Sequence, residues 1–204
     1  PLSDKAAVSL FGNTSVNAVY TGTGSGSVNV VGAVDLKTSM ESYDFKVNSA
    51  LWNFYATGKG SKDSGYGITQ KGSAGIATNE ALYTREVPWG VISGETNVVN
   101  SFNEYSDAAI FVLGRSGGEG GDLSYTGAPD TIDGNYLQLS SVERDVLDNL
   151  INLKNAGKFK KVVLLINSAN AMQMDIISQY EDTIDACMWI GQPGAGGMPG
   201  VAKL

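Results

Sequence analysis

The residue types that could perform chemistry in this chain are concentrated in three glycine-rich segments, residues 22–26, 115–123 and 191–200. The middle segment places one carboxyl group, that of Glu119, between two pairs of glycines. A carboxyl on such a loop avoids forced burial and can swing toward a substrate held elsewhere, as a general acid or base must do. The same pattern is also typical of a solvated turn, so the glutamate alone does not establish catalysis.

Other residues of these segments are candidates for ligand contacts. Ser25 follows Gly24 in a run of alternating glycines that lets backbone N–H groups and the serine hydroxyl approach a polar ligand closely. Asp122 is expected to fix its loop as a hydrogen-bond acceptor rather than to act as a second catalytic carboxylate. Arg115, at the start of the middle segment, is expected to stay solvated rather than to pair with either neighbouring acid.

The chain has no histidine and a single cysteine, Cys187, which restricts the chemistry further. Within this chain, Ser–His–Asp triads, Cys–His pairs, histidine-containing zinc sites and disulfides are excluded. We expect neither a metal site nor an organic cofactor. Cys187 lies in an apolar run and is expected to be an inert core residue. One cysteine is compatible with both a cytoplasmic and a secreted bacterial protein.

The composition is that of a globular domain: 42% of the 204 residues are hydrophobic and 17% are charged. The net charge is −7, and the largest basic cluster is the short run at residues 158–161. We therefore expect no nucleic-acid partner, because binding nucleic acid requires a basic face. No apolar run approaches the roughly 18 residues of a membrane-spanning helix, so we predict no membrane span.

The apolar residues also predict the elements that must position the glycine-rich segments. Continuous apolar runs, without the alternation of apolar and polar residues, occur at residues 5–11, 108–114, 161–166 and 185–190. Such runs are typical of strands buried on both faces. Helical spacing is expected from about residue 31, and again at 47–54, 98–102, 174–180 and after 200. The clearest helix starts with a capping box between Ser140 and Glu143, and it should end at Gly157.

This alternation of strands and helices predicts a single α/β domain, in which a mainly parallel sheet is sandwiched between helices in three layers. Ligands of such sheets collect at the carboxyl ends of the strands, and all three glycine-rich segments lie downstream of a predicted strand. Residues 57–87 are polar and glycine-rich without a sustained period, which indicates a surface insertion.

A nucleotide-binding domain is disfavoured by the spacing of the first segment. A dinucleotide fingerprint requires G-x-G-x-x-G directly after a strand, but residues 12–21 separate the first predicted strand from Gly22, and the third glycine is wrongly spaced. A phosphate-binding P-loop requires a Gly-Lys-Ser/Thr sequence, which is missing from this segment.

The joint order of these motifs resembles the second, C-terminal α/β domain of glycoside hydrolase family 3, the β-glucosidase and β-xylosidase group. Residues 22–26 are similar to that family's first glycine loop, and residues 109–122 to its strand leading into a Ser-Gly-Glu-Gly-x-Asp loop. The resemblance continues through residues 137–143, 162–172 and 185–194, and fails mainly over 57–87. The chain departs from the pattern at Gly117, where the loop has Ser, and at Ser27, where some relatives have Asp.

The resemblance implies a retaining β-glycosidase that hydrolyses terminal β-linked glucose or a related sugar from oligosaccharides or glucosides. In this family a (β/α) barrel domain supplies an aspartate nucleophile and most sugar contacts, and the sandwich domain supplies the acid/base glutamate. Transferred by motif, Glu119 is the general acid/base, and Ser25, Gly24 and Asp122 are the candidate substrate-binding residues.

In this interpretation residues 1–204 are the sandwich domain, with the barrel of the same polypeptide absent from this chain. The chain stops within a predicted helix, which favours a fragment, and alone it is expected to be inactive. The alternative is a non-catalytic α/β module that binds carbohydrate or a partner protein, in which Glu119 has no chemical role.

Overall fold

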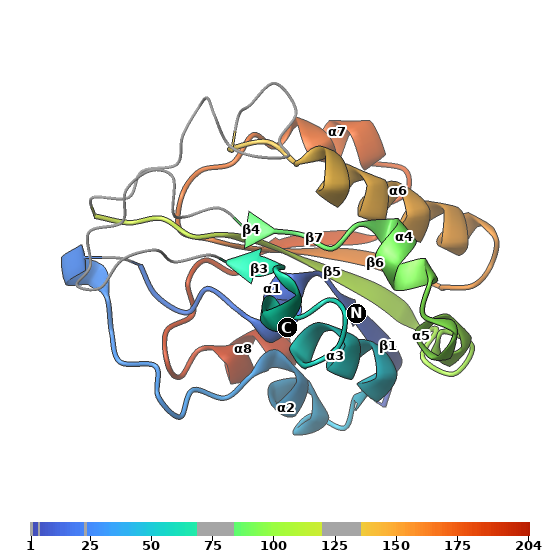
Figure 1. Cartoon of the computed structure of the whole chain (residues 1–204), viewed down its shortest axis with the longest axis horizontal. Helices are drawn as coiled ribbons and strands as arrows, with labels where there is room; N and C mark the ends of the chain where they lie inside the picture. The colour runs from blue at the N-terminus through green and yellow to red at the C-terminus, as the bar shows by residue number, and fades with distance from the viewer. Residues whose placement is uncertain (1, 4, 23, 69–83, 120–135) are drawn as a thin grey trace.

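The computed structural model describes the whole chain except residues 1, 4, 23, 69–83 and 120–135. Its described residues form a central sheet of five parallel strands in the order β2-β1-β5-β6-β7 (Figure 1). These strands are β1 (Ala7–Phe11), β2 (Lys46–Val47), β5 (Ala108–Arg115), β6 (Val162–Ser168) and β7 (Ala186–Trp189). A separate antiparallel pair consists of β3 (Gly67–Ile68) and β4 (Thr84–Arg85).

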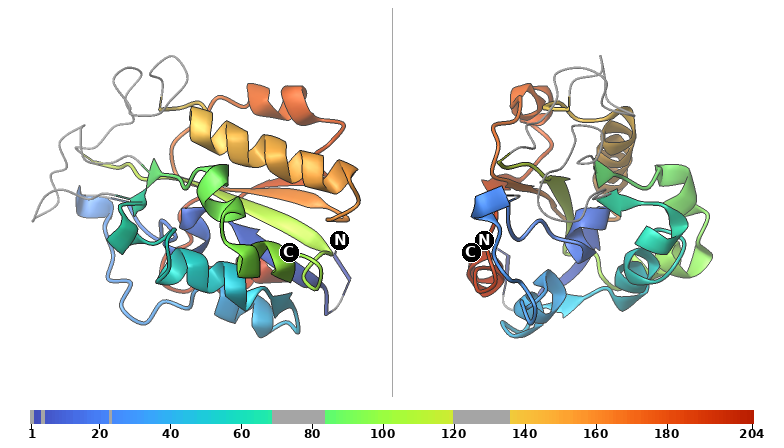
Figure 2. Two further views of the ribbon diagram at one scale, coloured as in Figure 1. Left: turned by 45° about the vertical axis from the view of Figure 1, so that its right-hand side comes forward. Right: turned by 60° about the vertical axis from the view of Figure 1, so that its left-hand side comes forward.

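Helices cover both faces of the sheet. The α-helices are α1 (Asn13–Val16), α2 (Leu36–Glu41), α3 (Ser49–Ala56), α4 (Trp89–Ser93), α5 (Thr96–Ser101), α6 (Ser141–Asn155), α7 (Asp175–Tyr180) and α8 (Met198–Lys203). Two short 3₁₀ helices are η1 (Gly24–Gly26) and η2 (Lys62–Ser64). Figure 1 shows α6 and α7 on one side of the sheet and α2 and α8 on the other, and both rotated views in Figure 2 show the same separation. None of the described helices is both long and apolar enough to cross a membrane.

The alternation of side chains along β5 explains why the core has two halves. Ala109, Phe111 and Leu113 pack with apolar residues of α3, α4, α5 and α6, whereas Ile110 and Val112 pack with those of α2 and α8. Successive residues of a strand point to opposite faces, so a strand that is apolar at every position serves both layers. The predicted three-layer α/β fold with a parallel sheet is therefore confirmed.

Most predicted elements are present, with shifted boundaries. The capping box of Ser140 and Glu143 begins α6, and Gly157 adopts a φ of 75° directly after its C-cap. The helix expected from residue 31 begins only at Leu36, because Asp35 caps it by accepting a hydrogen bond from the Thr38 amide. The short strand β2 was not predicted, because two residues are too few to produce a periodic signal.

The prediction that Cys187 is a core residue is wrong. Its strand, β7, is one of the two edge strands of the sheet, and Cys187 is exposed. An apolar run predicts a strand but does not distinguish the centre of a sheet from its edge, where one neighbour is missing. The edge position also leaves Trp189 45% exposed.

Both described ends of the predicted insertion at residues 57–87 pack against the domain. Asn13 donates a hydrogen bond from its side-chain amide to the carbonyl of Gly60 (2.8 Å). The carboxyl of Glu86, only 4% exposed, accepts hydrogen bonds from the backbone amides of Asn13 (2.9 Å) and Val87 (2.7 Å). Residues 84–87 are thus hydrogen-bonded to the segment that follows β1. Residues 69–83 of the predicted insertion lie outside the described residues.

Burial raises the pKa of Glu86 to about 8 against the two backbone hydrogen bonds that lower it. Because the unfolded chain releases this proton near pH 4.5 and the folded chain near pH 8, the folded state holds the extra proton between these values. The free energy of unfolding should therefore fall as pH rises through this interval, by about 1.4 kcal/mol per pH unit from this group.

We expect Glu86→Gln to remove that contribution, because the amide does not titrate. Thermal or urea unfolding of both proteins between pH 5 and pH 8 measures the difference, and the relevant quantity is the slope with pH rather than the stability at one pH. The same substitution at exposed Glu104 controls for the loss of a carboxylate. Equal slopes for the Glu86→Gln variant and the parent chain would contradict the raised pKa of Glu86.

Candidate active site

The candidate site lies where the first and middle glycine-rich segments meet at the carboxyl edge of the sheet. β1 and β5 are parallel neighbours, so the segments that follow them leave the same edge. Glu119, four residues beyond the end of β5, is exposed there. The backbone amide of Ser25 donates a hydrogen bond to Oε2 of Glu119 (2.6 Å), and the Ser25 hydroxyl donates to the same oxygen.

Gly24 makes this approach possible. It adopts a φ of +65°, which favours glycine, and a Cβ at this position would lie 2.7 Å from both Cβ and Oε2 of Glu119. A side chain at residue 24 would therefore overlap the carboxyl group. The sequence-predicted residues Gly24, Ser25 and Glu119 are brought together in the structure, whereas Asp122 lies outside the described residues.

The contacts with Ser25 also set the protonation of Glu119. The Ser25 hydroxyl, followed by its backbone amide, lowers the pKa of the Glu119 carboxyl below its ordinary value, because both donors stabilise the ionised form. In this arrangement Glu119 is a carboxylate that could act as a base. It would need a change of surroundings to act as an acid near neutral pH.

Asn167, which sequence analysis did not single out, connects the backbone that leads into the first glycine-rich segment to the start of the third. Its side chain is fully buried at the carboxyl end of β6, where it lies in register with Gly114 of β5. Oδ1 accepts a hydrogen bond from the Val19 amide (2.6 Å), and Nδ2 donates to the carbonyls of Val19 (2.9 Å) and Gly191 (2.7 Å). A polar residue ending an otherwise apolar strand was the available sequence signal.

Two more contacts extend these connections. The amide of Gly194 donates to the carbonyl of Tyr20 (2.8 Å), which joins the third loop to the first. The side chain of Gln192 donates to the carbonyl of Gly117 (3.4 Å), which joins the third loop to the middle one. The third loop is also shorter than predicted, because α8 begins at Met198 rather than after residue 200.

Gly117 stands where the resembling family has a serine, and the structure shows what occupies that space. A Cβ on Gly117 would lie 3.0–3.2 Å from the side-chain amide of Asn170. The neighbouring Ser116 is buried and presents no hydroxyl to solvent. The polar group beside residue 117 is therefore the Asn170 amide, another residue that sequence analysis did not identify.

The prediction that Arg115 is solvated is wrong. Its side chain is 1% exposed and forms a bidentate ion pair with Glu143 (2.6 and 2.7 Å). The guanidinium also donates to the carbonyls of Tyr136 (2.9 Å) and Gln138 (2.7 Å), and lies over the Tyr136 ring. A buried arginine requires such pairing, and the partner comes from the α6 capping box. Arg115 thus ties the end of β5 to residues 136–143, where the described chain resumes after the middle loop.

Trp189, the last residue of β7, lies at the carboxyl ends of the strands, as the candidate site does. Its indole Nε1 donates a hydrogen bond to the carbonyl of Ser168 at the end of β6 (2.6 Å), and its ring is partly exposed. Trp52 and Trp89 pack partly buried against the two halves of the core. An exposed ring whose orientation is fixed by a hydrogen bond can stack on a sugar face.

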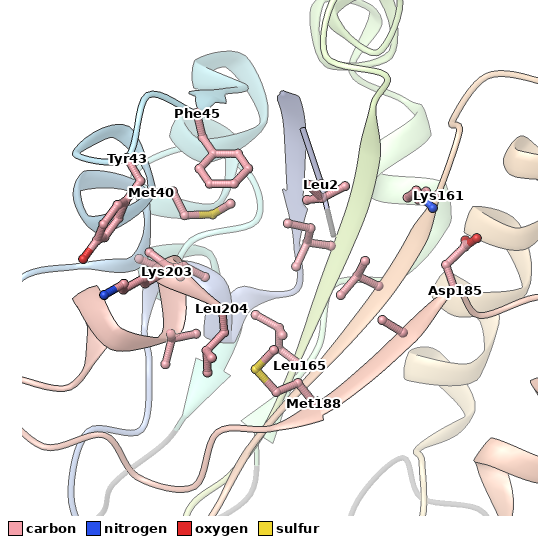
Figure 3. Close-up of a pocket in the computed structure, with 16 residues that line it drawn as sticks. Leu2, Met40, Tyr43, Phe45, Lys161, Leu165, Asp185, Met188, Lys203 and Leu204 are labelled. Atoms are coloured by element: carbon pink, nitrogen blue, oxygen red, sulfur yellow. The ribbon is translucent and has the colours of Figure 1, made fainter. Parts of the chain in front are cut away.

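A cavity of about 440 Å³ lies away from this site, on the face that α2 and α8 cover (Figure 3). Figure 3 shows apolar side chains along it, including Met40, Phe45 and Met188, with Lys161 and Asp185 at one end. Asp185 forms an ion pair with Lys154 (2.7 Å). The lining offers surface for packing but no pair of carboxyl groups, and within the described residues no group of three His, Cys, Asp or Glu side chains could hold a metal ion.

We expect Asn167→Asp to weaken the connection between the loops. The aspartate keeps an acceptor for the Val19 amide but places a second carboxyl oxygen against the carbonyls of Val19 and Gly191, which both lose their donor. The free energy of unfolding should fall by about 2–4 kcal/mol. Chemical denaturation measures it, and the loss should shrink at acidic pH, where the protonated carboxyl can donate again.

Asn29→Asp is the matched control for this variant, because exposed Asn29 only accepts a hydrogen bond from Val31 through its side-chain oxygen. Its unfolding free energy should stay within about 0.5 kcal/mol of the parent chain. An Asn167→Asp variant as stable as this control would mean that the amide does not hold the loops.

Comparison with known proteins places this geometry in a family. A "Beta-glucosidase" of Ruminococcus albus is 28% identical over the whole chain, which spans 19% of that protein. The structure of a β-glucosidase from Paenibacillus barengoltzii superposes on the whole chain with a TM-score of 0.76 and 26% identity, over 20% of its own length. β-Glucosidase 3B from Thermotoga neapolitana, solved with α-D-glucose, shares the fold (TM-score 0.70, 20% identity, 25% of its length).

The chain thus spans only about a fifth to a quarter of the length of these relatives. The model of the glycosyl hydrolase family 3 C-terminal domain matches it from residue 1 to residue 204. The parallel sheet with its three loops at one edge is therefore that of a glycosyl hydrolase family 3 C-terminal domain, and this chain belongs to that family.

Proposed function

We propose that this chain is the acid/base-contributing domain of a retaining β-glycosidase that hydrolyses terminal β-linked glucose, or a related sugar, from oligosaccharides or glucosides. Glu119 is the general acid/base, and a (β/α) barrel domain of the same polypeptide supplies the nucleophilic carboxylate. The observation that carries the proposal is the exposed Glu119 carboxyl, held by Ser25 at the loop-bearing edge of a family 3 domain.

The requirement for a second domain follows from the chemistry. A retaining glycosidase needs two carboxyl groups about 5–5.5 Å apart, one as nucleophile and one as acid and then base. Among the described residues, Glu119 is the carboxyl that accepts hydrogen bonds from the first loop. The chain spans only about a fifth of the length of two of its relatives, which leaves room in them for another domain. The barrel would dock over this edge with the sugar between the two domains.

The roles of the surrounding residues are proposed on two grounds. The contacts of Ser25 and Gly24 with Glu119 favour a position beside the sugar on the side of the first loop, whereas the proposed contact of Asp122 with the sugar rests on the motif alone. Docking would exclude water from the Glu119 carboxyl, which raises its pKa from the lowered value of the exposed domain. A carboxyl tuned in this way can protonate the departing glycosidic oxygen and later deprotonate the attacking water.

In the full-length enzyme, we expect Glu119→Ala to lower kcat/KM about 10²–10⁴-fold on glucosides with poor leaving groups, which need protonation. Aryl glucosides with acidic leaving groups should lose less in the first step and accumulate the glycosyl-enzyme, because no base activates water. Azide, which needs no deprotonation, should attack this intermediate, displace the enzyme carboxylate and restore turnover as a β-glycosyl azide. Steady-state rates and product identification measure these effects.

Glu104→Ala provides the control, because exposed Glu104 precedes β5 at the opposite end of that strand. Its rates should match those of the parent enzyme. An unaffected rate in Glu119→Ala would remove the catalytic assignment and favour a module that only binds carbohydrate or a partner.

The isolated 204-residue chain should fold but hydrolyse no β-glucoside. Cooperative thermal unfolding by circular dichroism tests folding, because the chain contains both halves of a packed core. Assays with an aryl β-glucoside at high protein concentration test activity. Turnover by the purified chain that is lost in its Glu119→Ala variant would contradict a nucleophile on another domain.

A further inference from the structure

We propose that Ser25 is a positioning residue that holds the ionised Glu119 carboxylate in a resting pose, and that a sugar hydroxyl which takes over the Ser25 hydroxyl releases Glu119 to become an acid. This inference rests on the proposed function of Glu119. It assigns Ser25 a role beyond contact with the sugar, since the residue would link substrate binding to the protonation of the catalytic glutamate.

The first step of the argument is the direction of the hydrogen bonds. Both the amide and the hydroxyl of Ser25 donate to Oε2 of Glu119, and two donors on one oxygen favour the ionised carboxylate over the protonated acid. The lowered pKa of Glu119 agrees with this direction. The first chemical step of a retaining glycosidase instead needs the protonated acid. The resting pose therefore opposes that step.

The second step is that the first loop is braced independently of Glu119. The hydroxyl of Thr21 accepts a hydrogen bond from the Val28 amide (3.0 Å) and donates to the carbonyl of Gly26 (3.2 Å). The amide of Ser27 donates to the carbonyl of Gly24 (3.1 Å). None of these three hydrogen bonds involves Glu119. The loop itself therefore positions the Ser25 amide and hydroxyl to which the glutamate binds.

The third step is competition for one proton. A serine hydroxyl carries a single hydrogen, so Ser25 Oγ cannot donate to Glu119 and to a sugar oxygen at the same time. A sugar that accepts from Ser25 removes one of the two donors that stabilise the carboxylate. Entry of the sugar would also displace the water that remains around the carboxyl between the two domains, and both effects favour protonation of Glu119.

The test is the pH dependence of kcat/KM in the full-length enzyme, whose basic limb reports ionisation of the essential acid in the free enzyme. Ser25→Ala removes one donor, so the basic limb should move to higher pH, while Ser25→Thr, which keeps a hydroxyl, should leave it near its original position. Ser27→Ala is the matched control in the same loop, and its limb should not move. Thermal unfolding of each variant checks that the exposed substitutions leave the fold intact.

A Ser25→Ala variant whose kcat/KM falls equally at every pH, with an unmoved limb, would overturn the proposal and leave Ser25 as a sugar contact alone. Glu119→Gln separates this failure from failure of the proposed function. Loss of the basic limb in Glu119→Gln with an unmoved limb in Ser25→Ala would reject only the inference. An unchanged rate and limb in Glu119→Gln would reject the proposed function, and the inference with it.

Discussion

The buried side-chain amide of Asn167 is the interaction that ties together two of the backbone segments leaving the sheet beside the candidate site. The carboxyl ends of parallel strands bring loops to one edge, but they do not fix the loops relative to one another. Asn167 does so because one amide both accepts from and donates to Val19 and also donates to Gly191. An amide can satisfy three backbone groups at once, which makes it suited to a position with no access to water.

Buried ionisable groups provide a second level of support beneath the loops: the Arg115–Glu143 ion pair, and Glu86, which burial keeps protonated up to about pH 8. Arg115 and Glu143 connect the end of β5 to the start of α6, and Glu86 connects residues 84–87 to the start of α1. These groups are costly to bury and are stabilised only by complete hydrogen bonding. They bond to the ends of segments rather than to the middle of elements, so the buried groups lie beneath the loops while the Glu119 carboxyl itself is exposed.

The exposed site and the buried supports use carboxyl groups in opposite ways. Burial dominates at Glu86 and raises its pKa, whereas hydrogen bonds from Ser25 dominate at Glu119 and lower its pKa. The difference arises from solvation, because the same side chain loses its water in one place and keeps it in the other. A glutamate that starts exposed and ionised can change its protonation when a sugar or a second domain covers it. A glutamate that is already buried, such as Glu86, cannot undergo a comparable change in solvation.

The sequence by itself determined the strands β1, β5, β6 and β7, the main helices and the exposed loop position of Glu119, because continuous apolar runs, the Ser140 capping box and glycine placement are local signals. Only the tertiary structure decided which polar groups meet: Ser25 with Glu119 across 94 residues, and Asn167 with Val19 across 148. It also placed Arg115 inside and Cys187 at an exposed edge. These outcomes depend on strand order and on the distant partners that it brings together, and neither is encoded in a short window of residues.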